Sequence, residues 1–315
     1  MTSLAGRTGD ARGARRCQPP ALRNGDSAIV DSRGSTAARS HATEAAMTEK
    51  LATYTHGHHA SVVGQHRKRT AAEAARFLLP HLRPGMRLLD VGCGPGSITV
   101  GLAEAVAPGE VLGIDLAGDV LDIGRELAAE KQLRNVRFEA GDVLELSEPE
   151  GSFDVVYAHQ VLQHVSDPVA ALHAMRRLLA PRGVVAVRDS DYGTATWSPP
   201  DARLARWLEI YHAVAARNGA EADAGRYLHG WLHAAGFRDL QASGTTWTFP
   251  GYDSIATWAT SWAERTTRSN LAVQAMQYGI ADASELEHVA QGFREWSRQP
   301  AAFFTIGHVE VLGHK

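Results

Sequence analysis

Residues 88–96 read LLDVGCGPG, and this stretch decides the fold. It is an apolar strand that ends in three alternating glycines. Glycine allows a positive φ and lets the backbone lie within contact distance of a ligand, where a Cβ would clash. The stretch therefore predicts a strand followed by a ligand-binding loop. A glycine-rich turn without a ligand is the simpler alternative.

An acidic residue follows at the spacing expected for a nucleoside cofactor. Asp115 ends a second apolar run, and a carboxylate at the tip of the next strand suits a ribose diol because it offers only acceptors. A dinucleotide fingerprint, G-x-G-x-x-G, requires a third glycine where this chain has Ser97. The pattern G-x-G-x-G therefore disfavours an NAD-dependent oxidoreductase, which we keep as the alternative.

Residues 90–96, DVGCGPG, closely resemble motif I of the class I S-adenosylmethionine (SAM) methyltransferases. The resemblance implies that the glycines let the loop pass close to the methionine portion of SAM, while the aspartate orders the turn. The cysteine would contribute mainly its backbone. The residues expected at the cofactor in this loop are Asp90, Gly92, Cys93, Gly94 and Gly96.

Two later segments extend the resemblance. It implies that Asp115 binds both ribose hydroxyls, with Leu116 against the adenine. Residues 141–143, Gly-Asp-Val, resemble the adenine contact of the family, so Asp142 is expected to accept from the exocyclic amine and Val143 to offer its backbone N–H.

Residues 153–165, FDVVYAHQVLQHV, resemble the fourth-strand motif of the family, which commonly ends Leu-His-His-Val. Gln163 replaces the first of those histidines. The resemblance implies that Ala158 and His159 reach SAM largely through their backbone and that His164 lies toward the sulfonium. His164 is the candidate catalytic base, and a hydrogen-bonded structural histidine is the alternative.

Strands and helices are expected to alternate along the middle of the chain. This order predicts parallel strands joined by crossover helices, hence an α/β, doubly wound sheet that binds ligands beyond the carboxyl ends of its strands. The expected helices are 70–82, 96–106, 118–131 and 167–179, and the expected strands are 87–91, 110–114, 135–139, 153–158 and 182–189.

The pattern changes after Asp189. We expect a helix built on Leu204, Trp207 and Tyr211, a helix at 224–235, a strand at 239–249 and a long helical stretch at 253–298. The resemblance implies a Rossmann-like, mostly parallel seven-stranded sheet whose last strand, 303–312, runs antiparallel. The helical cap insertions, about 191–225 and 250–300, are candidates for a lid over the substrate.

All seven tryptophans lie beyond residue 196. An aromatic cap would suit a flat apolar or aromatic substrate. Ile255, Trp258 and Trp262 have helical spacing, which is typical of core packing, so we expect only one or two of the seven to face a pocket.

Composition narrows the class of protein. The formal charge of −3 over 315 residues gives no strong basic field, so nucleic acid is not an expected partner. The two cysteines, Cys17 and Cys93, form no disulfide or metal framework, and no apolar run reaches the length of a membrane span. We expect a cytoplasmic protein.

Residues 1–46 carry seven arginines against four acids, without sustained apolar periodicity. This composition predicts a disordered tail ahead of a methyltransferase domain at 47–315, with Met47 as a candidate natural start; an organelle transit peptide is the alternative. His56, His58 and His59 invite a metal hypothesis, but no cysteine or acid lies nearby, and we expect none.

The segment before the first core helix is where family members place a lid across SAM, so Tyr54, Gln65 and Arg69 are candidate cofactor contacts. The expected function is in-line SN2 transfer of a methyl group from SAM to an O, N or activated C of a small molecule. The ubiquinone and menaquinone C-methyltransferases are the best general likeness, whereas the arsenic methyltransferases need more cysteines. A non-catalytic SAM-binding protein is the remaining alternative.

Overall fold

The computed structural model describes residues 55, 64 and 66–315. The chain divides into two units after Lys50, and every described residue belongs to the second unit, Leu51–Lys315. The expected tail at 1–46, the candidate start Met47 and the three histidines of the metal hypothesis lie outside the described residues.

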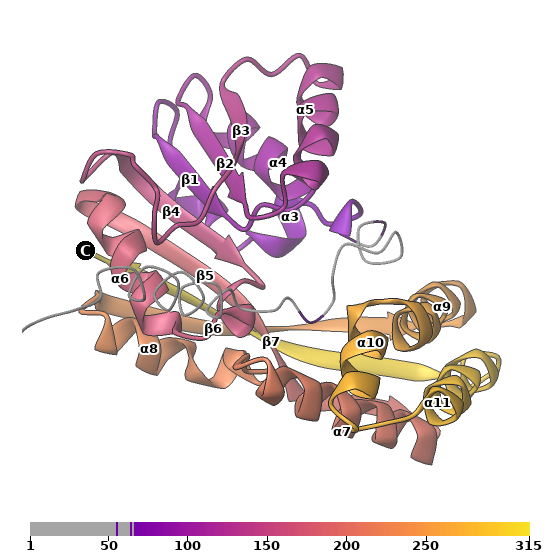
Figure 1. Ribbon diagram of the computed structural model, residues 1–315. Helices are drawn as coiled ribbons and strands as arrows, with labels where there is room; N and C mark the ends of the chain where they lie inside the picture. The colour runs from indigo at the N-terminus through magenta and orange to yellow at the C-terminus, as the bar shows by residue number, and fades with distance from the viewer. Residues whose placement is uncertain (1–54, 56–63, 65) are drawn as a thin grey trace, which may run out of the picture. The chain divides into compact units, whose positions relative to one another are not determined.

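Seven strands form one sheet in the order β3-β2-β1-β4-β5-β7-β6 (Figure 1). The first five strands in chain order are parallel, and β7 runs antiparallel to both β5 and β6. This is the doubly wound sheet that the sequence predicts. The strands are β1 Leu88–Val91, β2 Val111–Asp115, β3 Val136–Ala140, β4 Phe153–His159, β5 Leu179–Ser198, β6 Arg238–Pro250 and β7 Phe303–His314.

Successive strand residues point to opposite faces of the sheet, and all four residues of β1 are buried. Both faces of the parallel strands are therefore covered by helices. In β1, Leu88 packs in the core beneath α3 and α4, whereas Leu89 packs in the core beneath α6 and α8. The helices of this half are α3 Ala71–Ala74, α4 Ser97–Val106, α5 Leu121–Glu130, α6 Pro168–Leu178 and α8 Leu228–Ala234, with 3-10 turns η1 Leu79–His81, η2 Gly118–Val120, η3 Leu162–His164 and η4 Ala224–Tyr227.

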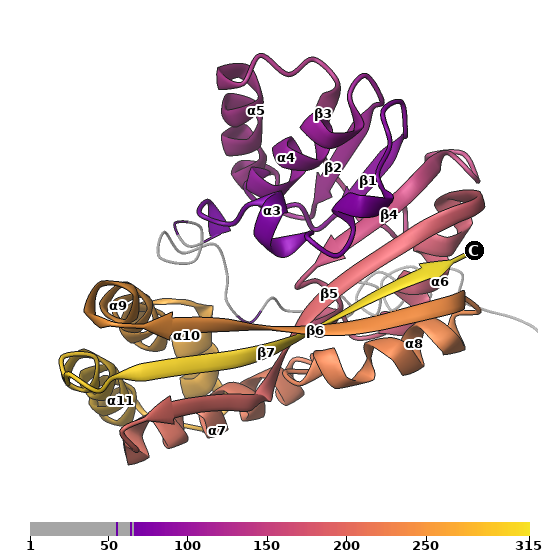
Figure 2. The ribbon, with the colours of Figure 1, turned by 180° about the vertical axis from the view of Figure 1, so that it is seen from behind.

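Strands β5, β6 and β7 continue beyond the parallel part of the sheet and carry a helical cap (Figures 1 and 2). The cap has a core of its own, in which Trp207, Trp258 and Phe293 are buried. The prediction of a long helical stretch after residue 253 is confirmed. The cap helices are α7 Ala202–Arg217, α9 Tyr252–Arg268, α10 Asn270–Gln277 and α11 Ala283–Trp296.

Two local predictions were wrong. The helix expected over 70–82 is interrupted, since α3 ends at Ala74 and only η1 follows. Pro80 lies in the first turn of η1, where the missing N–H of a proline is tolerated, so it belongs to the start of this turn and does not account for the end of α3 at Ala74. Residues 191–198, expected to begin an insertion, extend β5 instead and pair with β7 up to Ser198 and Phe303.

Within the part of the chain that the structure describes, every helix is too short or too polar to serve as a membrane span.

Candidate active site

A cavity of about 260 Å³ lies where the carboxyl ends of the parallel strands meet the cap. Its wall has two halves. The first, which we call the cofactor half, comes from the loops after β1, β2, β3 and β4. The second, the aromatic half, comes from β5, β6, β7, α7 and α9, and its aromatic members are Tyr192, Trp207, Trp247, Phe249, Trp258, Trp262 and Phe304.

The glycine loop after β1 opens the cofactor half. Gly92, Gly94 and Gly96 have φ values of +65°, +53° and +71°, in the left-handed region that favours glycine. A Cβ at Gly94 would meet no atom within 4 Å, whereas one at Gly96 would lie 2.6 Å from the ring of Phe138. Gly94 thus lines the cavity, and Gly96, which is outside its lining, packs against β3.

Asp90 ties this loop to the following helix. Its carboxylate is 2% exposed and accepts a hydrogen bond from Thr99 Oγ1 on α4 at 2.6 Å. Burial raises the pKa of Asp90 to about 7, and the hydrogen bond from Thr99 opposes that shift. The hydrogen bond between Thr99 and Asp90 gives a physical basis for the expectation that Asp90 orders the turn. The sequence alone does not indicate Thr99 as the partner.

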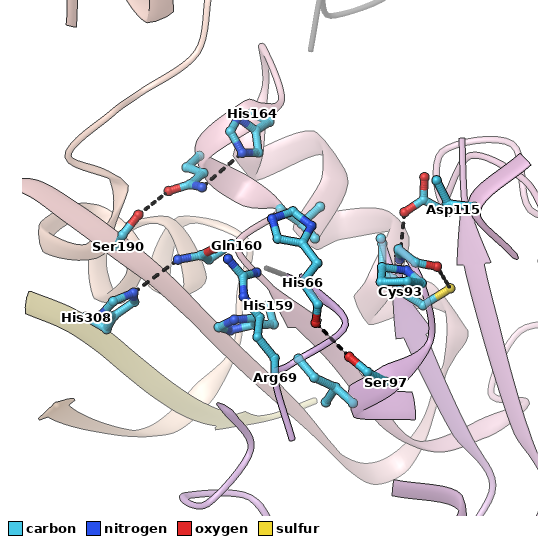
Figure 3. Close-up of a pocket in the computed structure, with 18 of the residues that line it drawn as sticks. His66, Arg69, Cys93, Ser97, Asp115, His159, Gln160, His164, Ser190 and His308 are labelled. Carbon is cyan, nitrogen blue, oxygen red and sulfur yellow. Dashed lines mark hydrogen bonds between the residues drawn. The ribbon is translucent and has the colours of Figure 1, made fainter. Parts of the chain in front are cut away.

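Asp115 ends β2 and faces the same loop (Figure 3). Its Oδ2 accepts from the N–H of Gly94 at 2.9 Å, and its Oδ1 accepts from the N–H of Ala117 at 3.0 Å. Leu116, 63% exposed, lies beside it at the cavity wall.

Asp142 and Val143, after β3, line the same half of the cavity. Asp142 Oδ1 accepts from the N–H of Leu144 at 2.9 Å, which holds the carboxylate in a turn of its own loop. The ends of β1, β2 and β3 therefore bring together the acids that the sequence singles out.

Ala158 and His159, at the end of β4, are both expected at the cofactor, but only one of them lines the cavity. Ala158 is fully buried in the sheet and does not line the cavity. His159 does line it. Both ring nitrogens of His159 are buried without a hydrogen-bond partner in the described part of the chain. Burial, with Arg69 and Arg188 adding to it, lowers the pKa of His159 well below its ordinary value.

His164 takes part in a chain of hydrogen bonds that the sequence did not reveal (Figure 3). Ser190 Oγ donates to Gln163 Oε1 at 2.5 Å, and Gln163 Nε2 donates to His164 Nε2 at 2.9 Å. Burial lowers the pKa of His164 to about 3, with Arg69 as a smaller cause. The ring is therefore neutral near pH 7, and its Nε2 lone pair already accepts a hydrogen bond.

Four of the seven tryptophans line the cavity, more than the one or two expected. Trp258 and Trp262 are also buried in the cap core, as their spacing indicates. The rings of Trp258 and Phe304 stack with centroids 3.8 Å apart, and those of Trp207 and Trp262 meet edge to face at 4.6 Å. The aromatic half is thus a continuous wall whose members serve both packing and the cavity.

Of the three candidate contacts in the N-terminal segment, Tyr54 and Gln65 lie outside the described residues. Arg69 lines the cavity, and its guanidinium carbon lies 5.0 Å from the centre of the Trp247 ring in the aromatic half. The neighbouring His66 accepts a hydrogen bond from Ser97 Oγ through its carbonyl at 2.9 Å, which joins this segment to the glycine loop.

Comparison with known proteins identifies the domain. The profile of the family described as "Methyltransferase domain" matches residues 82–236. An uncharacterized methyltransferase of Schizosaccharomyces pombe is 29% identical over 270 residues, which span 83% of this chain and 96% of that protein. A probable methyltransferase, ltbC, of Aspergillus luteorubrus is 28% identical over 296 residues, covering 86% of this chain and all of that one.

Two further comparisons concern one segment and the fold. Demethylmenaquinone methyltransferase of Staphylococcus aureus is 40% identical over 114 residues, 36% of this chain and 46% of that protein. The solved structure of the YcgJ protein from Bacillus subtilis, 22% identical, has the same fold, with a TM-score of 0.50 over 82% of this chain and 99% of that one. Motif I, the order of the seven strands and these relatives agree, and the chain is a SAM-dependent methyltransferase.

Proposed function

We propose that this enzyme transfers the methyl group of SAM to an O, N or activated C of a small-molecule acceptor by in-line displacement. The observation that carries the proposal is that one cavity is lined both by the glycine loop and by the aromatic half. Two reactants held in one enclosed space gain effective molarity, which contributes on the order of 7–11 kcal/mol in favourable cases.

The cofactor half fits SAM. The space beside Gly94 that no protein atom fills accommodates the methionine portion, together with the backbone of Gly92 and Cys93. Each carboxylate oxygen of Asp115 accepts one backbone N–H and has a second lone pair, so both ribose hydroxyls find an acceptor.

The adenine is assigned to the neighbouring loop. Asp142 would accept from its exocyclic amine, Val143 would offer a backbone N–H, and Leu116 would cover the ring. Gly96 and Ala158 shape the site from behind rather than touching the cofactor, because neither lines the cavity.

SAM supplies an already activated methyl group, so the chain's own task is to align the acceptor and exclude water. The aromatic half serves that task with its buried rings. His164 is better placed to hold Gln163 and Ser190 in position than to take a proton, since its Nε2 is already an acceptor. We therefore assign no general base.

The wider assignments are part of the same proposal. Aromatic walls favour an apolar or aromatic small molecule over a nucleic acid, in line with the weak net charge of −3. We propose a cytoplasmic location, because a sequence with only two cysteines offers no disulfide framework, and a catalytic domain at 47–315 whose cap helices enclose the acceptor.

The proposal is tested by titrating SAM into the protein by calorimetry and by incubating labelled SAM with phenols, quinones, amines and amides. Asp115→Ala should weaken SAM binding by roughly 1.5–3 kcal/mol, the range for hydrogen bonds to a charged group. Asp122→Ala, on the exposed surface of α5, is the matched control and should not change the affinity. Labelled product from no acceptor class, or an unchanged affinity in a folded Asp115→Ala variant, would overturn it.

A further inference from the structure

The two halves of the cavity carry opposite charge. The carboxylates that line it, Asp90, Asp115 and Asp142, all belong to the cofactor half. Among the described residues, no aspartate or glutamate lines the aromatic half. The basic side chains that line the cavity beside the aromatic half are Arg265 on α9, His308 on β7, His159 at the end of β4, and His66 and Arg69 ahead of α3. An acceptor bound there meets basic groups and aromatic faces.

Several buried polar atoms of this wall have no hydrogen-bond partner in the described part of the chain, among them Trp207 Nε1 and His308 Nδ1, and His159 is the ring in which both nitrogens lack one. It is 7% exposed, and neither ring nitrogen has a hydrogen-bond partner in the described part of the chain. A buried polar group without a partner costs free energy, and native structures contain few of them. Its position in the cavity wall indicates that a bound ligand supplies the missing partner.

The surroundings of His159 select the charge of that ligand. Its ring lies 6.0 Å from Trp247, measured between centroids, and the guanidinium carbons of Arg69 and Arg188 each lie 5.0 Å from the same Trp247 ring. Glu310 on β7 pairs with Arg188 at 3.1 Å and balances its charge.

The other groups that face His159 are His66, ahead of α3, and His308 on β7. His308 accepts a hydrogen bond from Gln160 Nε2 at 3.1 Å (Figure 3). Gln160 has a φ of +55°, which is uncommon for a residue other than glycine. A neutral imidazole and a cationic guanidinium are both donors, so this corner suits an acceptor oxygen that carries negative charge.

We propose that the aromatic half binds a phenol as its phenolate, with the ring among the aromatic walls and the oxygen held by His159 and Arg69. This inference rests on the proposed function, because it names the acceptor class of the same site. The phenol loses its proton to solvent on binding. The oxygen then uses a lone pair to form the new O–C bond, and the electron pair of the broken S–C bond stays on sulfur. The products are a neutral aryl methyl ether and S-adenosylhomocysteine.

The chemistry has a consequence for turnover. Methylation removes the negative charge of the oxygen, so the ether loses the charge-assisted hydrogen bonds that held the phenolate. The corner thus distinguishes substrate from product, and a separate general base is unnecessary because the acceptor is already ionised.

The test uses 4-nitrophenol, whose phenolate absorbs visible light and whose protonated form does not, with the full-length protein and S-adenosylhomocysteine. The pH at which the bound phenol ionises should lie at least one unit below that of free 4-nitrophenol, since tenfold tighter binding of the anion corresponds to one unit. 4-Nitroanisole should bind at least tenfold more weakly, and 4-nitrobenzoate should not compete. Equal binding of the anisole, or binding of the benzoate alone, would overturn the proposal.

Three variants test which side chains cause the shift in the ionisation of bound 4-nitrophenol. His159→Phe and Arg69→Gln should each remove most of the ionisation shift, and His159→Asn, which keeps a donor, should restore part of it. Arg67→Gln is the matched control, because Arg67 is exposed and does not line the cavity. If His159→Phe fails to fold, Arg69→Gln decides, and a full shift in that variant would contradict the proposal.

Two measurements separate this inference from its alternatives. A purely structural role for His159 predicts that His159→Phe lowers the melting temperature, whereas replacing an unpaired polar ring by an apolar one should leave it unchanged or raise it. Calorimetry with S-adenosylhomocysteine on the same samples tests the proposed function by itself. Retained binding without an ionisation shift would overturn the phenolate proposal and leave the proposed function standing, whereas lost binding in the unmodified protein would overturn the proposed function and, with it, the inference that rests on it.

Discussion

The two halves of the cavity are built in different ways. The cofactor half comes largely from residues 90–143, where short loops follow neighbouring parallel strands and backbone hydrogen bonds fix the shape. The aromatic half draws on residues 190–308, from five elements whose side chains pack into one core. The first half depends on local backbone conformation and the second on long-range packing. Substitutions should therefore separate SAM binding from acceptor binding.

The largest effect is expected from Gly94→Val in the cofactor half. Gly94 has a φ of +53°, and a side chain there would enter the open space of the cavity. We expect SAM affinity to fall by more than about 100-fold, or ~2.7 kcal/mol, while circular dichroism still shows the folded sheet.

Gly85→Val is the matched control for backbone strain. Gly85 has a φ of +90°, also meets no atom within 4 Å of a built Cβ, and lies outside the cavity. Both variants should lose a similar amount of free energy of unfolding, but only Gly94→Val should lose affinity for SAM. Equal loss of affinity in the two would show that strain, rather than contact with the cofactor, explains the glycine.

The same difference, between local backbone conformation and long-range packing, explains which parts of the site can be predicted from the sequence. Glycine spacing and strand-end acids are local patterns, so the sequence predicts the loop at 90–96, Asp115 and Asp142. The element order predicted the parallel sheet for the same reason. A resemblance to motif I added the antiparallel last strand and the cofactor.

The rest depends on contacts between distant segments. Gln163 meets Ser190 only because β4 and β5 are neighbours, and the extension of β5 pairs with a strand more than a hundred residues later. A tryptophan with helical spacing is predicted to be core, and no local pattern shows that Trp258 also lines a cavity. The resemblance predicts only a backbone contact for His159, and no local pattern indicates that both of its ring nitrogens are buried without a hydrogen-bond partner in the described part of the chain.

The next effect concerns the aromatic half. Trp258 stacks on Phe304 and lines the cavity, so Trp258→Leu removes part of the wall. We expect acceptor binding to weaken about tenfold and the free energy of unfolding to fall by about 1–3 kcal/mol, with SAM affinity unchanged. Trp231→Leu is the control, since Trp231 on α8 does not line the cavity. A loss of SAM affinity in Trp258→Leu would show that the halves are coupled.

A smaller effect is expected at a buried acid of β5 that does not line the cavity. Asp189 on β5 is fully buried, and its Oδ1 accepts weakly from the N–H of Gln163 at 3.4 Å. Burial raises the pKa of Asp189 from 3.8 to about 8. Between these values the folded state binds more protons than the unfolded state, so this group makes stability fall as pH rises.

Asp189→Asn should remove that dependence. From pH 5 to pH 9, the free energy of unfolding of the variant should rise by at least about 1.4 kcal/mol relative to that of the unmodified protein, which is the equivalent of one pKa unit. His164 acts in the opposite direction below its ordinary pKa and is common to both proteins, so the difference isolates Asp189. Urea unfolding at several pH values measures it, with Asp122→Asn as an exposed control. A constant difference across pH would contradict the assignment.

The smallest effect is expected at Cys93, in the middle of the glycine loop. A Cβ built at Gly113 would lie 3.0 Å from Cys93 Sγ, so the thiol packs against β2. Burial, together with the carboxylates of Asp90 and Asp115, raises the pKa of the thiol well above its ordinary value, which keeps it protonated and unreactive. Cys93→Ala should change SAM affinity by less than about threefold, because the loop acts through its backbone. Mass spectrometry after alkylation at pH 8 should find the Cys93 peptide unmodified in the native protein and modified in urea. Rapid native alkylation, or a tenfold loss of affinity, would show that the thiol itself faces the cofactor, and the cofactor half would then depend on side chains as the aromatic half does.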